Sequence, residues 1–204
     1  MSPRARKRET VEEALARRVE AQSGRPRALP RALRELAAVD RAAYDAVAST
    51  PTATLDTPLR RLSNAANYSR LWFGIAAALG LVGGRRGRRA ALEGLVSIGV
   101  TSATVNLGLK RAAGRARPDL AGPAVALRHV RMPGSTSFPS GHAASASAFA
   151  YAAGRRLPLL SVPLRALAAG VGYSRVHTGV HSPGDVVAGA ILGAGISALV
   201  AAAF

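Results

Sequence analysis

The stretch FPSGHAASASAFAY, residues 138–151, decides how the rest of the chain is interpreted. It places His142 directly after Pro-Ser-Gly, at the head of a segment made almost entirely of alanine, serine and aromatic residues. A histidine at the start of an apolar helix either finds a polar partner there or takes part in chemistry there. Which of the two applies depends on what else the chain brings to the same place.

The composition favours a membrane protein with basic loops. Lys and Arg number 28 against 11 Asp and Glu, a formal net charge of +17, yet 49% of the residues are hydrophobic and only 4% are aromatic. A nucleic-acid-binding protein would normally carry more aromatic rings for base stacking, so we expect no nucleic-acid partner. The absence of cysteine excludes disulfides and thiolate metal sites. The polar, arginine-rich first 30 residues predict no cleavable secretory signal.

Apolar segments begin near residue 64 and predict an all-α integral membrane bundle of about five to six helices. Only two of the segments approach the roughly 20 residues that a span needs, so the others are expected to pack inside the bundle. Small residues dominate throughout, which allows helices to approach closely. We therefore expect a multi-pass protein of the cell membrane. The expected segments are about 64–84, 90–109, 142–154, 157–173 and 185–204, of which the second and the last are the long ones.

The N-terminal part is expected to be a basic, partly helical extension over residues 1–60, ahead of a membrane-embedded domain over 61–204. A capping-box pattern of Thr10 and Glu13 predicts a first amphipathic helix. A second is predicted over 31–48, where charged residues exclude a membrane span. That helix would lie on the bilayer surface or pack against the bundle.

Two polar clusters stand at the ends of apolar segments. The first is KRAAGRARP, with Lys110 and Arg117, which alone could be a basic loop beside lipid headgroups. The second is PSGH, where Ser140 and Gly141 would begin a helix whose free backbone N–H groups favour an anion. An ordinary serine N-cap followed by His142 is the simpler alternative for that cluster.

The third cluster is SRVHTGVHSPGD, residues 174–185. His177, His181 and Asp185 recur every four residues, as metal ligands on one helix would, but two glycines and a proline exclude a continuous helix. Asp185 in the first turn of the last helix would instead accept the Nδ1 proton of His181 and leave Nε2 as nucleophile or base. We expect His177 to be structural and predict no metal site.

Topology brings the three clusters together. The loop 110–141 contains no apolar span, so the first two clusters share one face of the membrane. The third and fourth apolar segments then cross the membrane and return, which brings the third cluster to that same face. Cations, helix amides and two histidines are what phosphoryl transfer requires: charge neutralisation, a nucleophile and a proton donor.

The clusters resemble the three signature motifs of the type 2 phosphatidic acid phosphatase superfamily, KxxxxxxRP, PSGH and SRxxxxxHxxxD, in order and at full spacing. The resemblance covers about residues 64–204 and implies a helical bundle that hydrolyses a phosphomonoester or pyrophosphate without metal or cofactor. It implies that His181 attacks phosphorus to give a phosphohistidine, Asp185 orients it, and His142 protonates the leaving group and then activates water. The phosphate ligands it implies are Lys110, Arg117, Ser140, Gly141 and Arg175.

The implied substrate is a lipid phosphate that enters between helices. The Ala-, Arg- and Gly-rich composition is typical of a high-GC genome and resembles the actinobacterial branch that acts on decaprenylphosphoryl phosphoribose. Phosphatidic acid, phosphatidylglycerol phosphate and undecaprenyl diphosphate stay open as alternatives, as does a non-enzymatic lipid-binding scaffold. Vanadium haloperoxidases and soluble acid phosphatases of the same superfamily are disfavoured by the apolar segments and by the lack of a predicted signal.

The distribution of Lys and Arg bears on the orientation in the membrane, and one residue departs from the family pattern. Lys and Arg are more numerous on the expected site face, even after three phosphate ligands are discounted, which favours a cytoplasmic site. The family usually has an aromatic residue after the nucleophilic histidine, whereas this chain has Ser182. The sequence predicts no oligomeric state.

Overall fold

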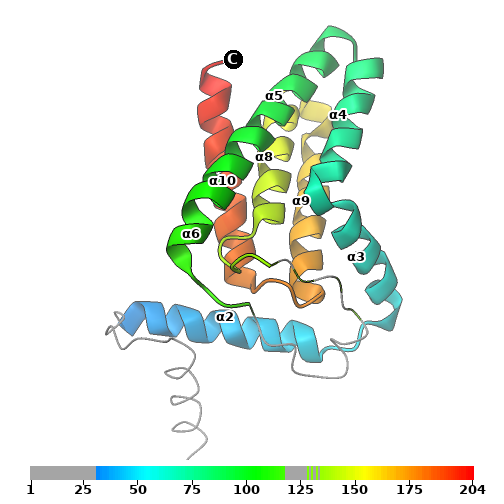
Figure 1. Ribbon diagram of the computed structural model, residues 1–204. Coiled ribbons are helices and arrows are strands. Elements are labelled where there is room, and N and C mark those ends of the chain that lie inside the picture. Colours follow the sequence, from blue (N-terminus) through cyan, green and yellow to red (C-terminus); the bar gives the residue numbers. More distant parts are fainter. Residues whose placement is uncertain (1–30, 118–127, 129, 131, 133) are drawn as a thin grey trace, which may run out of the picture. The chain divides into compact units, whose positions relative to one another are not determined.

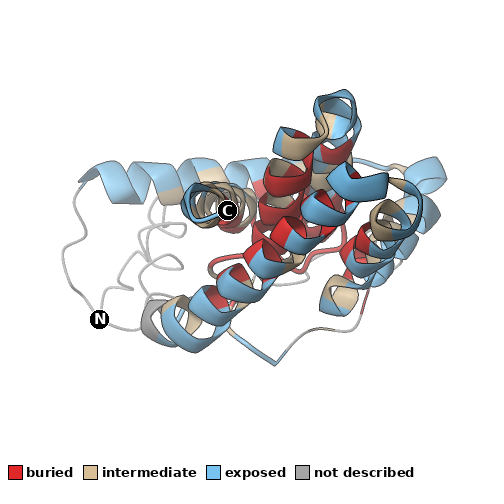
Figure 2. Ribbon diagram, turned by 90° about the horizontal axis from the view of Figure 1, so that it is seen from above, coloured by how far each residue is buried: buried red, intermediate tan, exposed pale blue. Residues whose placement is uncertain are grey.

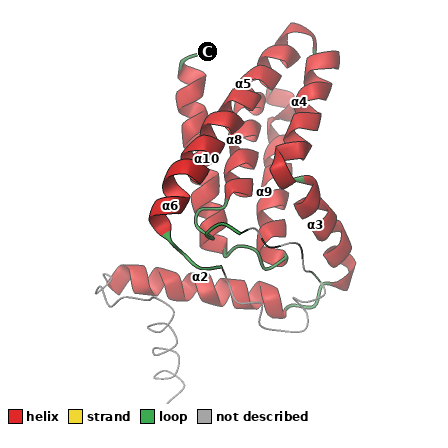
Figure 3. Ribbon diagram, viewed as in Figure 1, coloured by secondary structure: helices red, strands yellow, loops and turns green. Residues whose placement is uncertain are grey.

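The computed structural model describes residues 31–117, 128, 130, 132 and 134–204, and these residues contain helices and no strand (Figure 3). The predicted helix that starts at Thr10 lies outside them. The chain divides into two compact units, residues 1–38 and 39–204, and the bundle belongs to the second. The functional boundary expected at residue 60 stays a prediction.

Most of the expected apolar segments are helices with nearly the expected bounds. The start of the segment expected at 64–84 was wrong, because the backbone turns at Tyr68 and Ser69, whose φ angles of 54° and 58° are left-handed. In chain order the elements are α2 (Arg31–Ser49), α3 (Ala53–Ala65), the 3-10 turn η1 (Asn67–Ser69), α4 (Arg70–Val82), α5 (Gly84–Ala103), the π-helical turn η2 (Thr104–Leu109), α6 (Lys110–Ala113), α8 (Gly141–Arg156), α9 (Pro158–His177) and α10 (Pro183–Ala202).

Helix α8 is the centre of the bundle and packs against α5, α9 and α10 (Figure 1). Its alanines let three neighbours approach at once, because a methyl side chain keeps the helix axes close. Figure 2 shows that the buried residues gather on the inner faces of the helices. The buried alanines of this helix are Ala143, Ala144, Ala146, Ala148, Ala150, Ala152 and Ala153.

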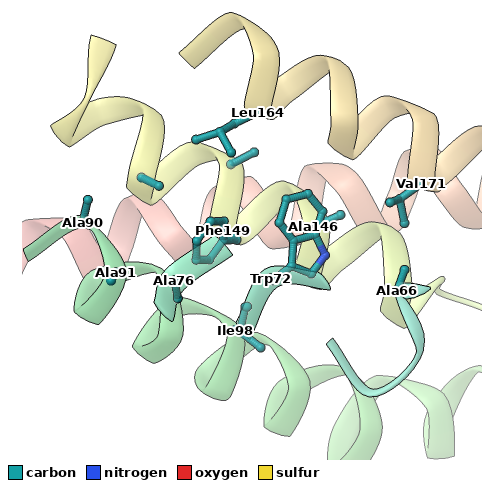
Figure 4. Packing of buried hydrophobic residues seen from close by; sticks show 12 residues of the cluster. Ala66, Trp72, Ala76, Ala90, Ala91, Ile98, Ala146, Phe149, Leu164 and Val171 are labelled. Carbon is teal, nitrogen blue, oxygen red and sulfur yellow. The ribbon is translucent and has the colours of Figure 1, made fainter. Parts of the chain in front are cut away.

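Two aromatic rings fill the core between α4, α5 and α8 (Figure 4). Trp72 and Phe149 are fully buried, with ring centroids 5.4 Å apart, a separation at which aromatic pairs are attractive. Gly94 on α5 makes room for Phe149, because a Cβ there would stand 2.6 Å from the ring. Phe149 of the opening stretch is therefore a core residue.

Glycines set the distance between α8 and α10. A Cβ on Gly189 would collide with the carbonyl oxygen of Ser140, and one on Gly193 with that of Ala144. The two backbones therefore touch along this contact, as in closely packed membrane helices. This contact fixes the N-terminus of α8 relative to α10.

Two helices of the described chain are long and apolar enough to cross a membrane: Gly84–Leu109 and Pro183–Ala202. They overlap the two segments that the sequence singled out, 90–109 and 185–204. The first carries the buried Glu93, which is ion-paired with Arg155 at 3.0 Å and Arg156 at 2.5 Å. A carboxylate inside a span is thus paired at the end of the bundle where α8 finishes. The same span ends in η2, a π-helical turn directly before Lys110.

Candidate active site

One end of the bundle collects the three polar clusters. The N-termini of α8 and α10, the C-terminus of α9 and the end of α6 all lie there, at the lower end of the view in Figure 1. Residues 134–140 cross the same end as a loop. Topology alone predicted this arrangement, and the structure has it.

The N-terminus of α8 forms an anion-binding geometry. Ser140 is the N-cap: its Oγ accepts from the N–H of Ala143 at 3.4 Å, and its own N–H donates to the Asp185 carbonyl at 2.9 Å. A Cβ on Gly141 would stand 3.7 Å from Nζ of Lys110, so the lysine ammonium lies beside this helix end. A cation and the positive end of a helix dipole therefore point at one place.

The turn between α9 and α10 presents His181. Its N–H and that of Val180 both donate to the Arg175 carbonyl, at 3.1 and 3.0 Å. Ser182 then caps α10, because its Oγ accepts from the Asp185 N–H at 3.5 Å while the Asp185 carboxylate accepts from the Ser182 N–H at 3.0 Å. The serine that departs from the family pattern thus forms a capping box with Asp185.

Nδ1 of His181 faces two oxygens. It lies 3.5 Å from Oδ2 of Asp185 and 3.5 Å from Oγ of Ser137, and that hydroxyl donates to the same carboxylate oxygen. Acceptors on this side place the ring proton on Nδ1 and leave the Nε2 lone pair free. Burial lowers the pKa of His181 to about 4; the Asp185 hydrogen bond opposes this shift, and Arg117 and Arg175 add to it. The ring is therefore neutral at pH 7.

Arg117 stands in front of Nε2 of His181. Its Nη1 lies 3.4 Å from Nε2 of His181 and donates to the Val180 carbonyl at 2.8 Å. Its Nε donates to the Ser135 carbonyl at 3.1 Å, so the guanidinium is held from two sides. An oxyanion bound at Nε2 would meet this planar donor.

The cations of the site repel one another. The pKa of Lys110 is lowered by burial first and then by Arg117 and Arg175, and its Nζ donates to Oγ of Ser135 at 3.1 Å. Arg175 is buried, with Nη1 donating to Oγ of Ser63 at 2.6 Å, while its Nε has no hydrogen-bond partner among the described residues. A phosphate dianion would relieve this repulsion and supply an acceptor.

His142 is held by a residue that the sequence did not indicate. Its Nε2 lies 2.9 Å from Oδ1 of Asn67 in η1. The left-handed residues Tyr68 and Ser69 directly after Asn67 make the turn between α3 and α4. This unusual backbone places the Asn67 side chain against the start of α8.

The predicted structural role of His177 has support in its contacts. Its Nε2 lies 2.9 Å from Oδ1 of Asp56, and Nε of the buried Arg128 is 2.9 Å from the same oxygen. This network ties the C-terminal end of α9 to α3. None of the three side chains contacts His181 or Asp185 through a recorded hydrogen bond in the described part of the chain.

Sequence reasoning missed several side chains that contact the site, among them Asp40, Asn67, Arg115 and Ser137. Ser137 is two residues before Pro139 of the PSGH motif and had a positional signal, whereas Asp40, Asn67 and Arg115 match no fixed position of a motif. A cavity of about 310 Å³ between α8, α9 and α10 was also not foreseen. Alanines and glycine line most of it, together with Val186, the residue that follows Asp185.

Comparisons with known proteins agree with this geometry. The chain is 39% identical over 145 residues to decaprenylphosphoryl-5-phosphoribose phosphatase of Mycobacterium tuberculosis, which covers 69% of this chain and 76% of that protein. It is 40% identical over 99 residues to lipid A 1-phosphatase of Rhizobium johnstonii, covering 47% of this chain and 41% of that protein.

Two crystal structures share the fold. A transmembrane PAP2-type phosphatidylglycerolphosphate phosphatase from Bacillus subtilis matches with a TM-score of 0.62 and 27% identity, over 82% of this chain and 85% of that one. Aquifex aeolicus LpxE matches with a TM-score of 0.62 and 22% identity, over 78% and 92%, and supports the fold alone.

The family assignment rests on more than half of the chain. The sequence model of the PAP2 superfamily matches residues 90–204, which contain all three motifs. The predicted all-helical membrane fold and the predicted phosphatase class are confirmed by this match, by the phosphatases among the relatives and by the two structures. The chain therefore belongs to the PAP2 superfamily.

Proposed function

We propose that this membrane lipid-phosphate phosphatase works through a phosphohistidine at His181, with decaprenylphosphoryl-5-phosphoribose or a close relative as its substrate. One observation carries the mechanism: Nδ1 of His181 faces Asp185 and Ser137 while Nε2 faces Arg117. A neutral imidazole with a fixed tautomer and a cation at its free nitrogen is arranged for attack on phosphorus.

In the first step Nε2 of His181 forms a bond to phosphorus and the bond from phosphorus to the ester oxygen breaks. Asp185 stabilises the positive charge that develops on the ring. His142, at the head of α8, gives its proton to the leaving oxygen, and the bound phosphate dianion offsets the charges of Arg175 and Lys110 that otherwise disfavour a protonated His142. The phosphate oxygens lie against the ligand set named from the sequence: Lys110, Arg117, Ser140, Gly141 and Arg175.

In the second step water cleaves the phosphohistidine. His142, now neutral, takes a proton from the water as its oxygen attacks phosphorus. The bond to Nε2 breaks, inorganic phosphate leaves, and both histidines return to their starting states. Nothing in this sequence of steps calls for a metal ion, so chelators should not inhibit it.

The substrate proposal rests on similarity and on lipid character. The decaprenylphosphoryl-5-phosphoribose phosphatase is 39% identical to this chain over more than two thirds of both chains. The apolar cavity beside Val186 suits a substrate with a hydrocarbon chain better than a soluble phosphate ester. Phosphatidic acid, phosphatidylglycerol phosphate, undecaprenyl diphosphate and lipid A 1-phosphate are the alternatives that a substrate panel separates.

We also propose that the chain crosses the cell membrane several times with its active site on the cytoplasmic face. Helices α4 and α9 carry exposed apolar residues, and α8 packs within the bundle beside the two longest spans. Both features support a multi-pass arrangement. The excess of Lys and Arg on the site face supports its orientation. Labelling of single introduced cysteines in intact cells tests this orientation directly.

The activity test is phosphate release from the lipid panel in detergent with EDTA, for wild type and His181→Ala. Asp185→Asn is added, with the exposed Asp45→Asn as its matched control. We expect release by wild type and Asp45→Asn, none by His181→Ala, and a strong loss in Asp185→Asn. With a radiolabelled substrate, an acid-labile, base-stable phosphoprotein should form in wild type and should be absent in His181→Ala.

The possible results separate the alternatives. Release that survives in His181→Ala would overturn the phosphohistidine mechanism. Absence of release from every lipid, together with retained binding of lipid phosphate vesicles, would favour the scaffold. The lipid with the highest kcat/KM identifies the substrate, and a preference for phosphatidic acid or lipid A 1-phosphate would overturn the prenyl phosphoribose proposal.

A further inference from the structure

Arg115 lies between two carboxylates that come from opposite ends of the chain. Its Nη1 donates to Oδ1 of Asp185 at 3.0 Å, and its Nη2 donates to Oδ2 of Asp40 at 2.5 Å. Asp185 is fully buried and the side chain of Asp40 is 11% exposed, whereas that of Arg115 is 41% exposed. Asp40 belongs to α2, before the part of the chain that matches the superfamily.

The second oxygen of Asp40 is also engaged. Oδ1 accepts from the backbone N–H of Gly184 at 2.6 Å. Gly184 is in the first turn of α10, where backbone N–H groups lack partners within the helix and a negative charge is favoured. The absence of a side chain on Gly184 permits this approach, because a Cβ would stand 3.0 Å from Oδ1. Asp40 therefore caps α10 from a distant helix, one residue before Asp185.

These contacts complete the set of donors around Asp185. Oδ2 accepts from Ser137 and from the Ser182 N–H and faces Nδ1 of His181. Oδ1 accepts from Arg115. With a donor on each oxygen the carboxylate plane is fixed, whereas the terminal torsion of an aspartate is otherwise broad. Removal of the donor on Oδ1 would let the plane turn and carry Oδ2 away from the imidazole.

Arg115 needs Asp40 in order to act. A side chain as exposed as this one loses conformational entropy when it is held in one rotamer, and a single contact to Asp185 has to offset that cost alone. The second carboxylate, itself held by the Gly184 N–H, provides a charge-assisted hydrogen bond on the other side of the guanidinium. The two residues thus form one unit.

We propose that Asp40 and Arg115 are positioning residues for the phosphatase reaction, which makes α2 a part of the active site. They touch neither the phosphate nor the attacking nitrogen, and they act by fixing Asp185 against His181. This inference rests on the proposed function, since it assigns the pair a role through the carboxylate that orients the nucleophile.

The test measures kcat, KM and thermal unfolding for Asp40→Asn, Arg115→Gln and the double variant. Decaprenylphosphoryl-5-phosphoribose in detergent micelles is the first substrate and phosphatidic acid the second. Glu35→Gln, which breaks only the exposed pair with Arg31 on α2, and Arg111→Gln, at an exposed position of α6, are matched controls. His181→Ala runs in the same assay.

We expect each single variant to lower kcat about tenfold, a barrier about 1.4 kcal/mol higher, with KM within about twofold of wild type. The double variant should lose no more than the worse single variant, because both changes interrupt one path to Asp185. Asp40→Glu and Arg115→Lys keep the charges and should fall between wild type and the amide variants. The controls should match wild type.

Three results would overturn the positioning role: wild-type kcat in both amide variants, losses that multiply in the double variant, or a rise in KM that accounts for the whole effect. If the amide variants fail to fold, Asp40→Glu and Arg115→Lys decide instead, and wild-type kcat in both would contradict the proposal. His181→Ala separates the two levels, because phosphate release that survives in that variant contradicts the proposed mechanism itself.

Discussion

Nε2 of His142 lies 2.9 Å from Oδ1 of Asn67, so the proposed acid–base residue is oriented by a side chain 75 positions earlier. Asn67→Leu removes the acceptor with little change in volume and frees the imidazole to rotate. We expect kcat to fall at least about tenfold, a part of the roughly 10²–10⁴ that acid–base catalysis supplies. Steady-state kinetics with a lipid phosphate measure this loss.

The matched control is Asn64→Leu, the same replacement at an exposed position of α3. It should leave kcat and KM unchanged. Equal losses in both variants would mean that the leucine disturbs the η1 turn rather than the histidine, and would contradict the orienting contact.

His142→Ala should affect substrates according to their leaving groups. A lipid alkoxide is a poor leaving group and depends on the proton of His142, so we expect a loss of about 10²–10⁴ in kcat with lipid substrates. p-Nitrophenol leaves without protonation, so the first step with p-nitrophenyl phosphate should survive as a burst. Rapid-quench measurement of nitrophenol and phosphoenzyme checks this, and equal losses on both substrate types would assign His142 another role.

The pKa of His181 should lie far below that of an ordinary histidine. Burial first, and then Arg117 and Arg175, lower its pKa to about 4, although the hydrogen bond to Asp185 raises it, so the ring of this proposed nucleophile stays neutral as pH falls until about 4 is reached. NMR titration of ¹³C-labelled histidine in micelles, assigned with His181→Ala, should give that midpoint. Arg117→Met removes a cation and should raise the pKa; a wild-type midpoint near 6.5 would contradict the description.

Gly193 should be intolerant of any side chain. A Cβ there would collide with the Ala144 carbonyl oxygen, so Gly193→Ala should push α8 from α10 and destabilise the fold by about 1–3 kcal/mol. Gly195 has no atom within 4 Å of a built Cβ, so Gly195→Ala is the control and should be neutral or slightly stabilising. Thermal unfolding in detergent compares the two, and similar midpoints would contradict the close packing.

The sequence predicted the parts of the structure that depend on local pattern. The hydrophobic segments predicted the bounds of α8, α9 and α10 to within two residues, except that α9 extends four residues past the expected end, and the glycines and proline after His177 correctly excluded one continuous helix. The convergence of the clusters followed from counting crossings. The site residues named from the motifs keep their proposed roles until mutants are tested.

What could not be predicted depends on side chains that meet only after folding. The contact of Asn67 with His142 needs the left-handed turn at Tyr68 and Ser69, two residue types that give no signal for that conformation. In the sequence Asp40 is one charged residue among several on an amphipathic helix, and its neighbours give no indication that it contacts Gly184. Pairings of this kind depend on three-dimensional packing and leave no spacing to detect.

The π-helical turn η2, between α5 and Lys110, allows the number of residues in this helix to differ by one without a change in the direction in which Lys110 faces. A π turn holds one residue more than an α turn, so it acts as a one-residue insertion that the helix has absorbed. Deletion of one residue within 104–109 would restore α geometry and leave the residues that follow facing nearly as before, because the π turn already compensates for the extra residue. Lys110 would then still lie beside the N-terminus of α8. Homologous chains that lack one residue here should therefore place this lysine in the same position, with an α turn where this chain has a π turn.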